Sequence, residues 1–334
     1  MKKHNFKAVH LQKLKFLEMS YNPSWIIIVF VAMVFLSCAT APRLPAPDPI
    51  LENRTPELSV LPAGGRVYVW ADTVMGRPLL DLFAADFAGG RAAERMLDST
   101  SAAAAVLFET GEDRQFFLAA TGRYPRHRGN ISFAFSRGWR RQRGYDRQTF
   151  WLSRDNNMAV ALGANLALVS NIDPFEGFAR EIPPQTFAEF SQAMAVAGWL
   201  RNPSEAINGF IENLGLPLQI PAEDFFFGVL RSPEEDDAGP WELVFRIRSP
   251  SELHARSLIV LFATASFFVL QMAPGVIDGP YFSTQAGSIS LQEVARLLFA
   301  NVPVQDGEFL TLRISSLDEN TIALLFGLFS VYSN

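Results

Sequence analysis

The single cysteine, Cys38, carries the most distinctive chemistry in this 334-residue chain. One cysteine excludes an internal disulfide and any cysteine-based zinc or iron–sulfur site. The thiol stands just beyond Trp25–Leu36 (WIIIVFVAMVFL), a stretch of twelve residues without a charge. Two interpretations are open: a thiol modified at the end of an export signal, or a small apolar side chain that lies there incidentally.

The segment before the apolar stretch is strongly cationic. Residues 1–22 hold all five lysines of the chain, together with His4 and His10, against one acid, Glu18. A cationic region followed by an apolar stretch of this length is typical of a secretory signal peptide. A membrane-spanning helix needs about 20 apolar residues, so Trp25–Leu36 is short for a permanent anchor. Met19 is an alternative start, but it would discard every lysine, and we therefore favour the longer form.

The residues around the thiol, Phe35-Leu36-Ser37-Cys38, resemble the lipobox of bacterial lipoproteins in its looser, spirochaete-type form. The resemblance implies cleavage before Cys38, a diacylglycerol on its sulfur and an acyl chain on the new amino terminus. We expect no other cofactor. One chain of about 14 carbons binds a membrane weakly, whereas two or three hold a protein stably. We therefore expect a lipid-anchored protein of the cell membrane or outer membrane, facing the periplasm.

Four prolines follow within eight residues, Pro42–Pro49, and favour an extended, semi-rigid tether. The sequence predicts a domain organisation of five segments. It comprises a signal peptide at 1–37, a tether at 38–62, a first α+β repeat at 63–180, a helical connector at 181–222 and a second α+β repeat at 223–334.

The second chemical feature is a basic stretch, residues 123–154, with nine arginines and one acid, Asp146. Guanidinium groups bind phosphate and carboxylate in bidentate fashion and stack on aromatic rings. The stretch predicts an anion-binding patch for an anionic lipid, a glycan or an acidic protein. The alternative is a solvated face paired with acids elsewhere, such as Glu234–Asp237. The candidate residues are Arg126, Arg128, Arg137, Arg140, Arg141 and Arg143.

Charge and motifs exclude several other classes of function. Beyond residue 37 the chain has 24 arginines against 33 acids, a net charge of −9, which argues against nucleic-acid binding. His127 and His254 have no neighbour at metal-ligand spacing, and no nucleophile elbow or nucleotide-binding loop is present. We assign no catalytic, cofactor-binding or metal residue. Residue counts do not test a glycosidase pair, because its carboxylates meet only in space.

The remaining sequence predicts an α+β fold of two similar repeats, each an antiparallel sheet covered by helices. The clearest internal similarity is between Phe150–Leu162 and Phe309–Leu324. Alternating or apolar runs predict strands. They lie at 66–71, 103–109, 115–121, 149–154, 158–170, 224–230, 241–248, 309–315 and 321–332.

Helix starts are marked by caps and by proline at the first turn. They lie at Gly76-Arg77-Pro78, Thr186–Glu189, Asn202–Glu205 and Ser249–Glu252. Ile131–Arg141 is compatible with either a strand or a helix. Ser257–Ala273 has seventeen uncharged residues, which predicts either a fully buried core helix or a membrane-inserting one.

These observations lead to an envelope lipoprotein with a non-enzymatic binding or structural role. Two alternatives belong to other classes. A lipid or amphiphile carrier is suggested by the 29 phenylalanines and would need a large cavity lined by phenylalanine and leucine. An envelope hydrolase would need two carboxylates, or a histidine beside a serine, converging in a cleft.

Overall fold

In the computed structural model, most of the described strands lie in one antiparallel sheet. The structure describes residues 57–86, 97–110, 113–124, 133–143, 149–155, 157–163, 165–172, 185–204, 208, 220–232, 240–272, 281–284 and 287–332. The predicted signal peptide, Cys38 and the predicted tether up to residue 56 therefore lie outside the described residues, as do Arg126, Arg128, His127 and Glu234–Asp237.

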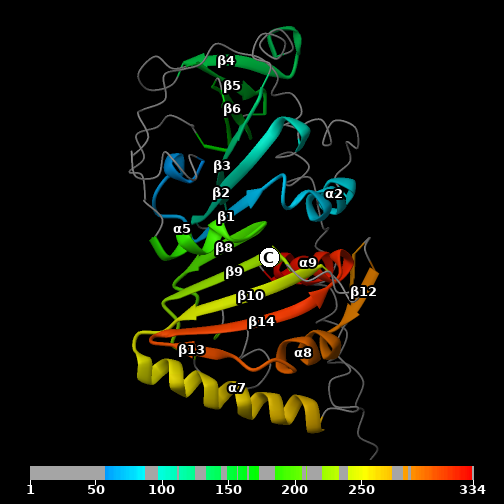
Figure 1. The fold of residues 1–334 in the computed structure, drawn as a ribbon. Helices are drawn as coiled ribbons and strands as arrows, with labels where there is room; N and C mark the ends of the chain where they lie inside the picture. The colour runs from blue at the N-terminus through cyan, green and yellow to red at the C-terminus, as the bar shows by residue number, and fades with distance from the viewer. Residues whose placement is uncertain are drawn as a thin grey trace, which may run out of the picture.

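The sheet has twelve strands in the order β13-β14-β10-β9-β8-β1-β2-β3-β7-β6-β5-β4 (Figure 1). Its strands in chain order are β1 (Val67–Asp72), β2 (Thr100–Thr110), β3 (Asp113–Gly122), β4 (Trp139–Arg143), β5 (Thr149–Ser153), β6 (Ala159–Leu162), β7 (Leu166–Ser170), β8 (Val196–Arg201), β9 (Asp224–Arg231), β10 (Trp241–Arg248), β13 (Val304–Asp306) and β14 (Phe309–Leu317). A separate hairpin pairs β11 (Tyr281–Thr284) with β12 (Gly287–Ser290).

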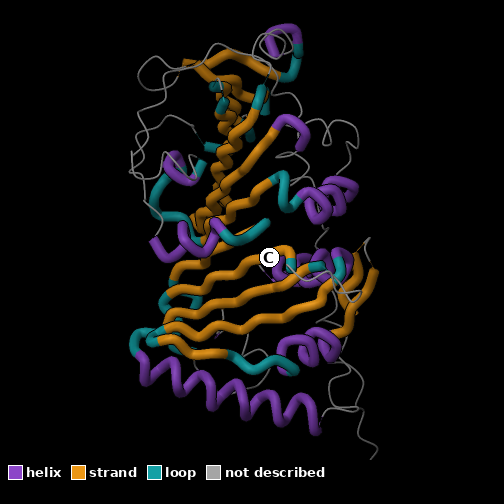
Figure 2. Tube along the Cα trace, in the orientation of Figure 1, coloured by secondary structure: helices purple, strands orange, loops and turns teal. Residues whose placement is uncertain are grey.

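Helices lie on both faces of this sheet (Figure 2). They are the 3-10 turn η2 (Leu58–Val60), α2 (Arg77–Asp86), α5 (Gln185–Gln192), α7 (Glu252–Met272), α8 (Leu291–Phe299) and α9 (Glu319–Tyr332). Strand side chains alternate between faces, so each face has its own core. One core includes Leu58 of η2, Phe187 of α5 and Trp199, and a second includes Leu79 of α2, Trp241 and Ile322 of α9. A third, near β4, includes Phe133 and Val160.

Alternation and capping predicted most of these elements correctly. β1, the β2–β3 hairpin, the β9–β10 hairpin, and the starts of α2 and α7 fall where the sequence places them. In α7, the backbone N–H of His254 donates to Ser251 Oγ (3.4 Å), as an N-terminal cap requires. The α+β class with an antiparallel sheet is therefore confirmed.

The expected strand at 321–332 is wrong, because these residues form helix α9. The polar residues before this segment, which the sequence predicted as a turn, cap the helix instead. Asp318 Oδ1 accepts a hydrogen bond from the backbone N–H of Thr321 (2.6 Å). An apolar run without a clear period does not separate a buried strand from a helix. The second half therefore lacks the terminal strand pair that the sequence comparison had assigned to it.

Two further expectations needed correction. Within the expected helical connector, Val196–Arg201 forms β8, a central strand, because its apolar and aromatic side chains pack into the core. Met158–Ser170 is two strands, β6 and β7, separated at Gly163. The helix start at Asn202 is only partly described, since residues 205–207 and 209–219 lie outside the described ranges.

Helix α7 is not the fully buried core helix that its composition suggested. It lies along the β13 end of the sheet and contacts β13, β14 and α8 (Figure 1). Ala255 and Leu258 are buried, whereas Leu253, Val260 and Phe267 are 71%, 65% and 57% exposed. Among the described residues, no helix meets the length and hydropathy that crossing a membrane requires.

Gly122 ends β3 where the β2–β3 register shifts, and it has no room for a side chain. A Cβ there would lie 2.0 Å from the carbonyl oxygen of Ser99 and 2.8 Å from Thr100 Cα. We expect Gly122→Ala to lower the free energy of unfolding by about 2–3 kcal/mol in urea titrations, because backbone must move. Gly138→Ala is the control, since its nearest neighbour would be Ser136 Oγ at 3.6 Å. Equal effects of the two substitutions would contradict the close approach.

Candidate functional site

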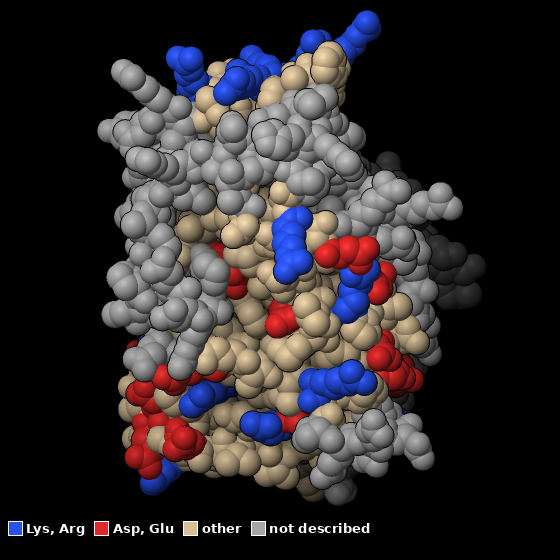
Figure 3. All heavy atoms as spheres, turned by 45° about the horizontal axis from the view of Figure 1, so that its top comes forward, with Lys and Arg blue, Asp and Glu red and all other residues tan. Residues whose placement is uncertain are grey.

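The arginine-rich segment forms one end of the sheet. β4 contains Arg140, Arg141 and Arg143 and is a terminal strand, paired with β5 on one side only. A strand at the edge of a sheet presents unpaired backbone groups, and charged side chains are common there. Space-filling Figure 3 shows arginine side chains together at this end of the molecule, with the acids lying elsewhere on the same view.

The structure brings together four of the six candidate arginines. Arg137, Arg140, Arg141 and Arg143 are all exposed, and Arg126 and Arg128 lie outside the described residues. Arg123 and Arg154, which the sequence placed in the same stretch, are also exposed. Within the described part of the chain, no ion pair joins Arg137, Arg141 or Arg143 to an acid. Glu234–Asp237, the acids that the alternative names as partners, lie outside the described residues, so pairing with them stays a prediction.

Aromatic packing holds this end in place. The buried Phe133 ring lies edge-on to Trp139 (4.9 Å between centroids) and stacks on Trp151 (5.5 Å). The backbone N–H of Arg154 donates to the carbonyl of Gly138 (2.9 Å), which joins the turn before β4 to the end of β5. The segment that was ambiguous in sequence is thus a helical turn at Phe133–Phe135 followed by a strand from Trp139.

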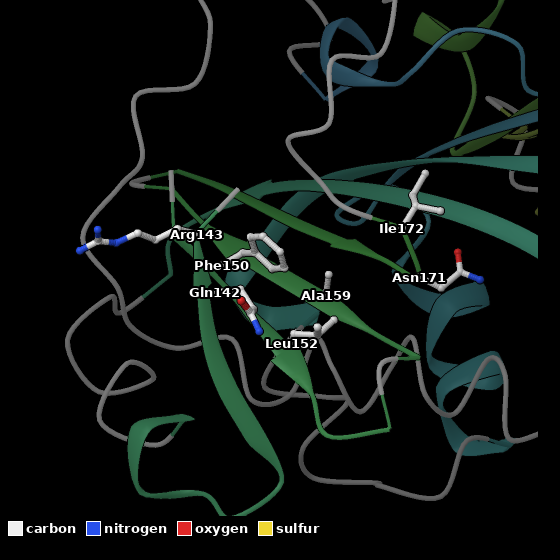
Figure 4. A pocket seen from close by; sticks show the side chains of 7 residues that line it. All are labelled: Gln142, Arg143, Phe150, Leu152, Ala159, Asn171 and Ile172. Atoms are coloured by element: carbon white, nitrogen blue, oxygen red, sulfur yellow. The ribbon is translucent and has the colours of Figure 1, made fainter. Parts of the chain in front are cut away.

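A pocket of about 340 Å³ lies beside β4, β5 and β6 (Figure 4). It is lined by Gln142, Arg143, Phe150, Leu152, Ala159, Asn171 and Ile172. The Arg143 guanidinium extends away from the other lining residues (Figure 4). Asn171 Oδ1 accepts from the backbone N–H of Phe116 (2.8 Å). With one phenylalanine and one leucine, this pocket is not the large apolar cavity that a lipid carrier needs.

The geometries that would suggest a hydrolase have local explanations. Ser251 Oγ lies 2.8 Å from His254 Nδ1, but both belong to the exposed cap of α7 and no described acid bonds to this histidine. Glu223 and Asp224 are adjacent carboxylates, and both contact Arg248 Nη2 (3.2 and 2.6 Å). No group of three potential metal ligands occurs among the residues that the structure describes.

Sequence reasoning missed one buried acid, Glu57, at the start of the described chain. It is 1% exposed, and its carboxylate accepts from Trp70 Nε1 (2.5 Å) and from Thr121 Oγ1 (3.2 Å). Burial raises the pKa of Glu57, the nearby charge of Asp72 raises it further, and these two hydrogen bonds oppose the increase. No local pattern marks this residue, because its partners lie 13 and 64 positions away.

The fold and site together define an α+β protein built on one long antiparallel sheet with an arginine-rich end. Solved structures of TP0453 have a similar fold. Crystal form III matches with a TM-score of 0.51 and 15% identity, over 81% of this chain and 98% of that chain. Form IV gives 0.51 and 14%, over 84% and 97%, and form I gives 0.50 and 15%, over 86% and 100%. No family model and no curated protein matches the chain. At these identities the likeness concerns the fold alone.

Proposed function

We propose that this protein is a lipoprotein of a bacterial cell envelope, anchored through Cys38, whose body is a non-enzymatic binding or structural module facing the periplasm. The observation that carries the proposal is the position of the only cysteine. It follows a cationic segment and an apolar stretch, and it precedes a proline-rich segment. A diacylglycerol on the sulfur and an acyl chain on the amino group would give the two or more chains that stable anchoring needs.

The start of the folded body is compatible with such a tether. Glu57, Leu58 and Leu61 are each at most 1% exposed, so the chain enters the core at this point. Eighteen residues, 39–56, separate Cys38 from it. A proline-rich segment of this length would hold the body away from a bilayer surface.

Substituting the thiol tests the anchor directly. In cells grown with a palmitate analogue, we expect Cys38→Ser to abolish the label, because serine cannot form the thioether. Ser37→Ala, which keeps a small residue before the cysteine, should retain it. The label is the readout, because an uncut Trp25–Leu36 would still hold the variant at a membrane. An unlabelled wild type, or an equally labelled Cys38→Ser variant, would refute the anchor.

We further propose that the body contains two similar α+β repeats. The two segments of greatest internal similarity both include strands, β5 and β14, which supports a shared origin. Helix α9 replaces the last strands of the second copy.

A further inference from the structure

Residues 133–143, at the β4 end, combine exposed arginine side chains with an exposed aromatic side chain. We call Phe135, Arg137, Arg141 and Arg143 the arginine tip. The three arginines are exposed and have no acid partner within the described ranges. Phe135 is 83% exposed, the largest exposure among the large apolar side chains described. A cationic surface with a protruding aromatic ring is the composition by which peripheral proteins bind lipid interfaces.

Phe135 is held outward by the packing of its own turn. Phe133, two residues earlier, is fully buried between Trp139 and Trp151. The backbone N–H of Ser136 donates to the carbonyl of Phe133 (3.3 Å), which closes the turn. The Phe135 ring can therefore enter a bilayer surface without any change in the fold.

The charge distribution of the whole chain gives the tip a preferred orientation. The chain beyond residue 37 is acidic, yet Figure 3 shows a group of arginine side chains at the β4 end with no acid beside it, whereas the other arginines in this view lie near acids. The nearest described acid in sequence, Asp155, already accepts from the amide nitrogen of Asn157 (3.2 Å). A protein with one cationic end and a net negative remainder is attracted to an anionic surface by that end and repelled elsewhere.

We propose that the arginine tip docks on the anionic phospholipid headgroups of the membrane that holds Cys38, with Phe135 in the interface. This inference rests on the proposed anchor. From Cys38 to the buried Glu57 the chain can span roughly 60 Å when extended, so the tip and the anchor can reach one bilayer. The anchor also raises the effective concentration of the tip at that surface.

Site-directed fluorescence on the full, lipidated protein tests the docking. Ala134 is exposed in the same turn, and Ala134→Cys provides the one free thiol once Cys38 is acylated. A fluorophore is attached to this thiol, and its quenching by brominated lipid chains is measured in phosphatidylcholine vesicles with or without phosphatidylglycerol. We expect phosphatidylglycerol to increase quenching and added salt to reverse the increase, because the attraction is electrostatic.

Charge removal at the tip provides the decisive comparison. Arg137→Gln/Arg141→Gln/Arg143→Gln should lower the docking constant about 100-fold, since each arginine near an anionic surface contributes roughly five-fold. The matched control removes three exposed arginines from the other half of the sheet and from α7, as Arg231→Gln/Arg256→Gln/Arg313→Gln. The control should dock nearly as well as the wild type.

Several outcomes overturn the proposal. They are quenching that is independent of phosphatidylglycerol, equal loss in the two triple variants, or saturable binding of a polyglutamate peptide without any response to lipid. The last outcome would assign the tip to an acidic protein. Palmitate labelling of the same preparation separates a failed anchor from a failed docking surface. If the chain carries no palmitate label, docking of the unanchored protein is measured by co-sedimentation with the same vesicles.

Discussion

Glu57→Ala is expected to lower the free energy of unfolding by about 2–3 kcal/mol at neutral pH. The substitution leaves the indole N–H of Trp70, which is 5% exposed, without its acceptor. A buried donor without a partner costs about 1–3 kcal/mol, and the space left by the carboxylate adds to that cost. Glu57→Gln keeps an oxygen toward Trp70 and should cost much less. Urea titration of both variants measures the difference, and equal losses would show that the hydrogen bond contributes little.

The same carboxyl group should give stability a characteristic pH dependence. Burial raises the pKa of Glu57 above its ordinary 4.5, so the folded chain binds this proton more tightly than the unfolded chain does. The resulting stabilisation is complete below the unfolded pKa and is lost as pH rises through the folded value. Neighbouring Asp72 adds to the rise, while Tyr124, whose pKa burial raises to about 12, stays neutral.

The Glu57→Gln variant, whose side chain does not titrate, isolates the contribution of Glu57 to the pH dependence of stability. We expect the stability of the wild type relative to Glu57→Gln to fall as pH increases from about 4 to 8. Urea titrations across that range give the difference curve. If the two proteins keep a constant difference, Glu57 does not titrate as its burial requires.

Phe187→Ala should produce the largest loss of stability, about 3–5 kcal/mol. Phe187 is a fully buried residue of α5, with its ring centroid 5.9 Å from that of Trp199 and 6.3 Å from that of Phe226. Truncation leaves a cavity between the helix and the centre of the sheet. A loss below 1 kcal/mol in urea titrations would mean that α5 packs loosely there.

The control for this truncation removes the same side chain from the surface. Phe135→Ala should change stability by at most about 0.5 kcal/mol, because Phe135 is 83% exposed and packs little. This variant also separates folding from docking, since it should weaken membrane contact at the tip without destabilising the body.

Local patterns predicted the elements whose signals are local. Strict alternation in β1 and the cap before α7 needed no knowledge of distant contacts, and both are confirmed. The last helix was missed because 321–332 is apolar throughout and carries no period. The single sheet could not be predicted either, since it depends on the pairing of β8 with β1, which lie more than 120 residues apart in the chain.

In the candidate site, too, the sequence predicted what depends on local composition and missed what depends on distant contacts. Composition located the arginines, because nine of them fall within one short stretch. The role of Phe135 could not be predicted, because Phe133 and Phe135 are the same residue type and only the fold buries one of them. The burial of Glu57 could not be predicted for a related reason. Its hydrogen-bond partners, Trp70 and Thr121, lie much later in the chain.

The position of β1 has a mechanical consequence for a tethered protein. The chain enters the body next to β1, which is hydrogen-bonded to β2 on one side and to β8 on the other. A pulling force transmitted from an anchored N-terminus would reach an interior strand before either margin of the sheet. Such a strand resists removal because two ladders must break together, whereas a strand at the margin can be peeled away along one.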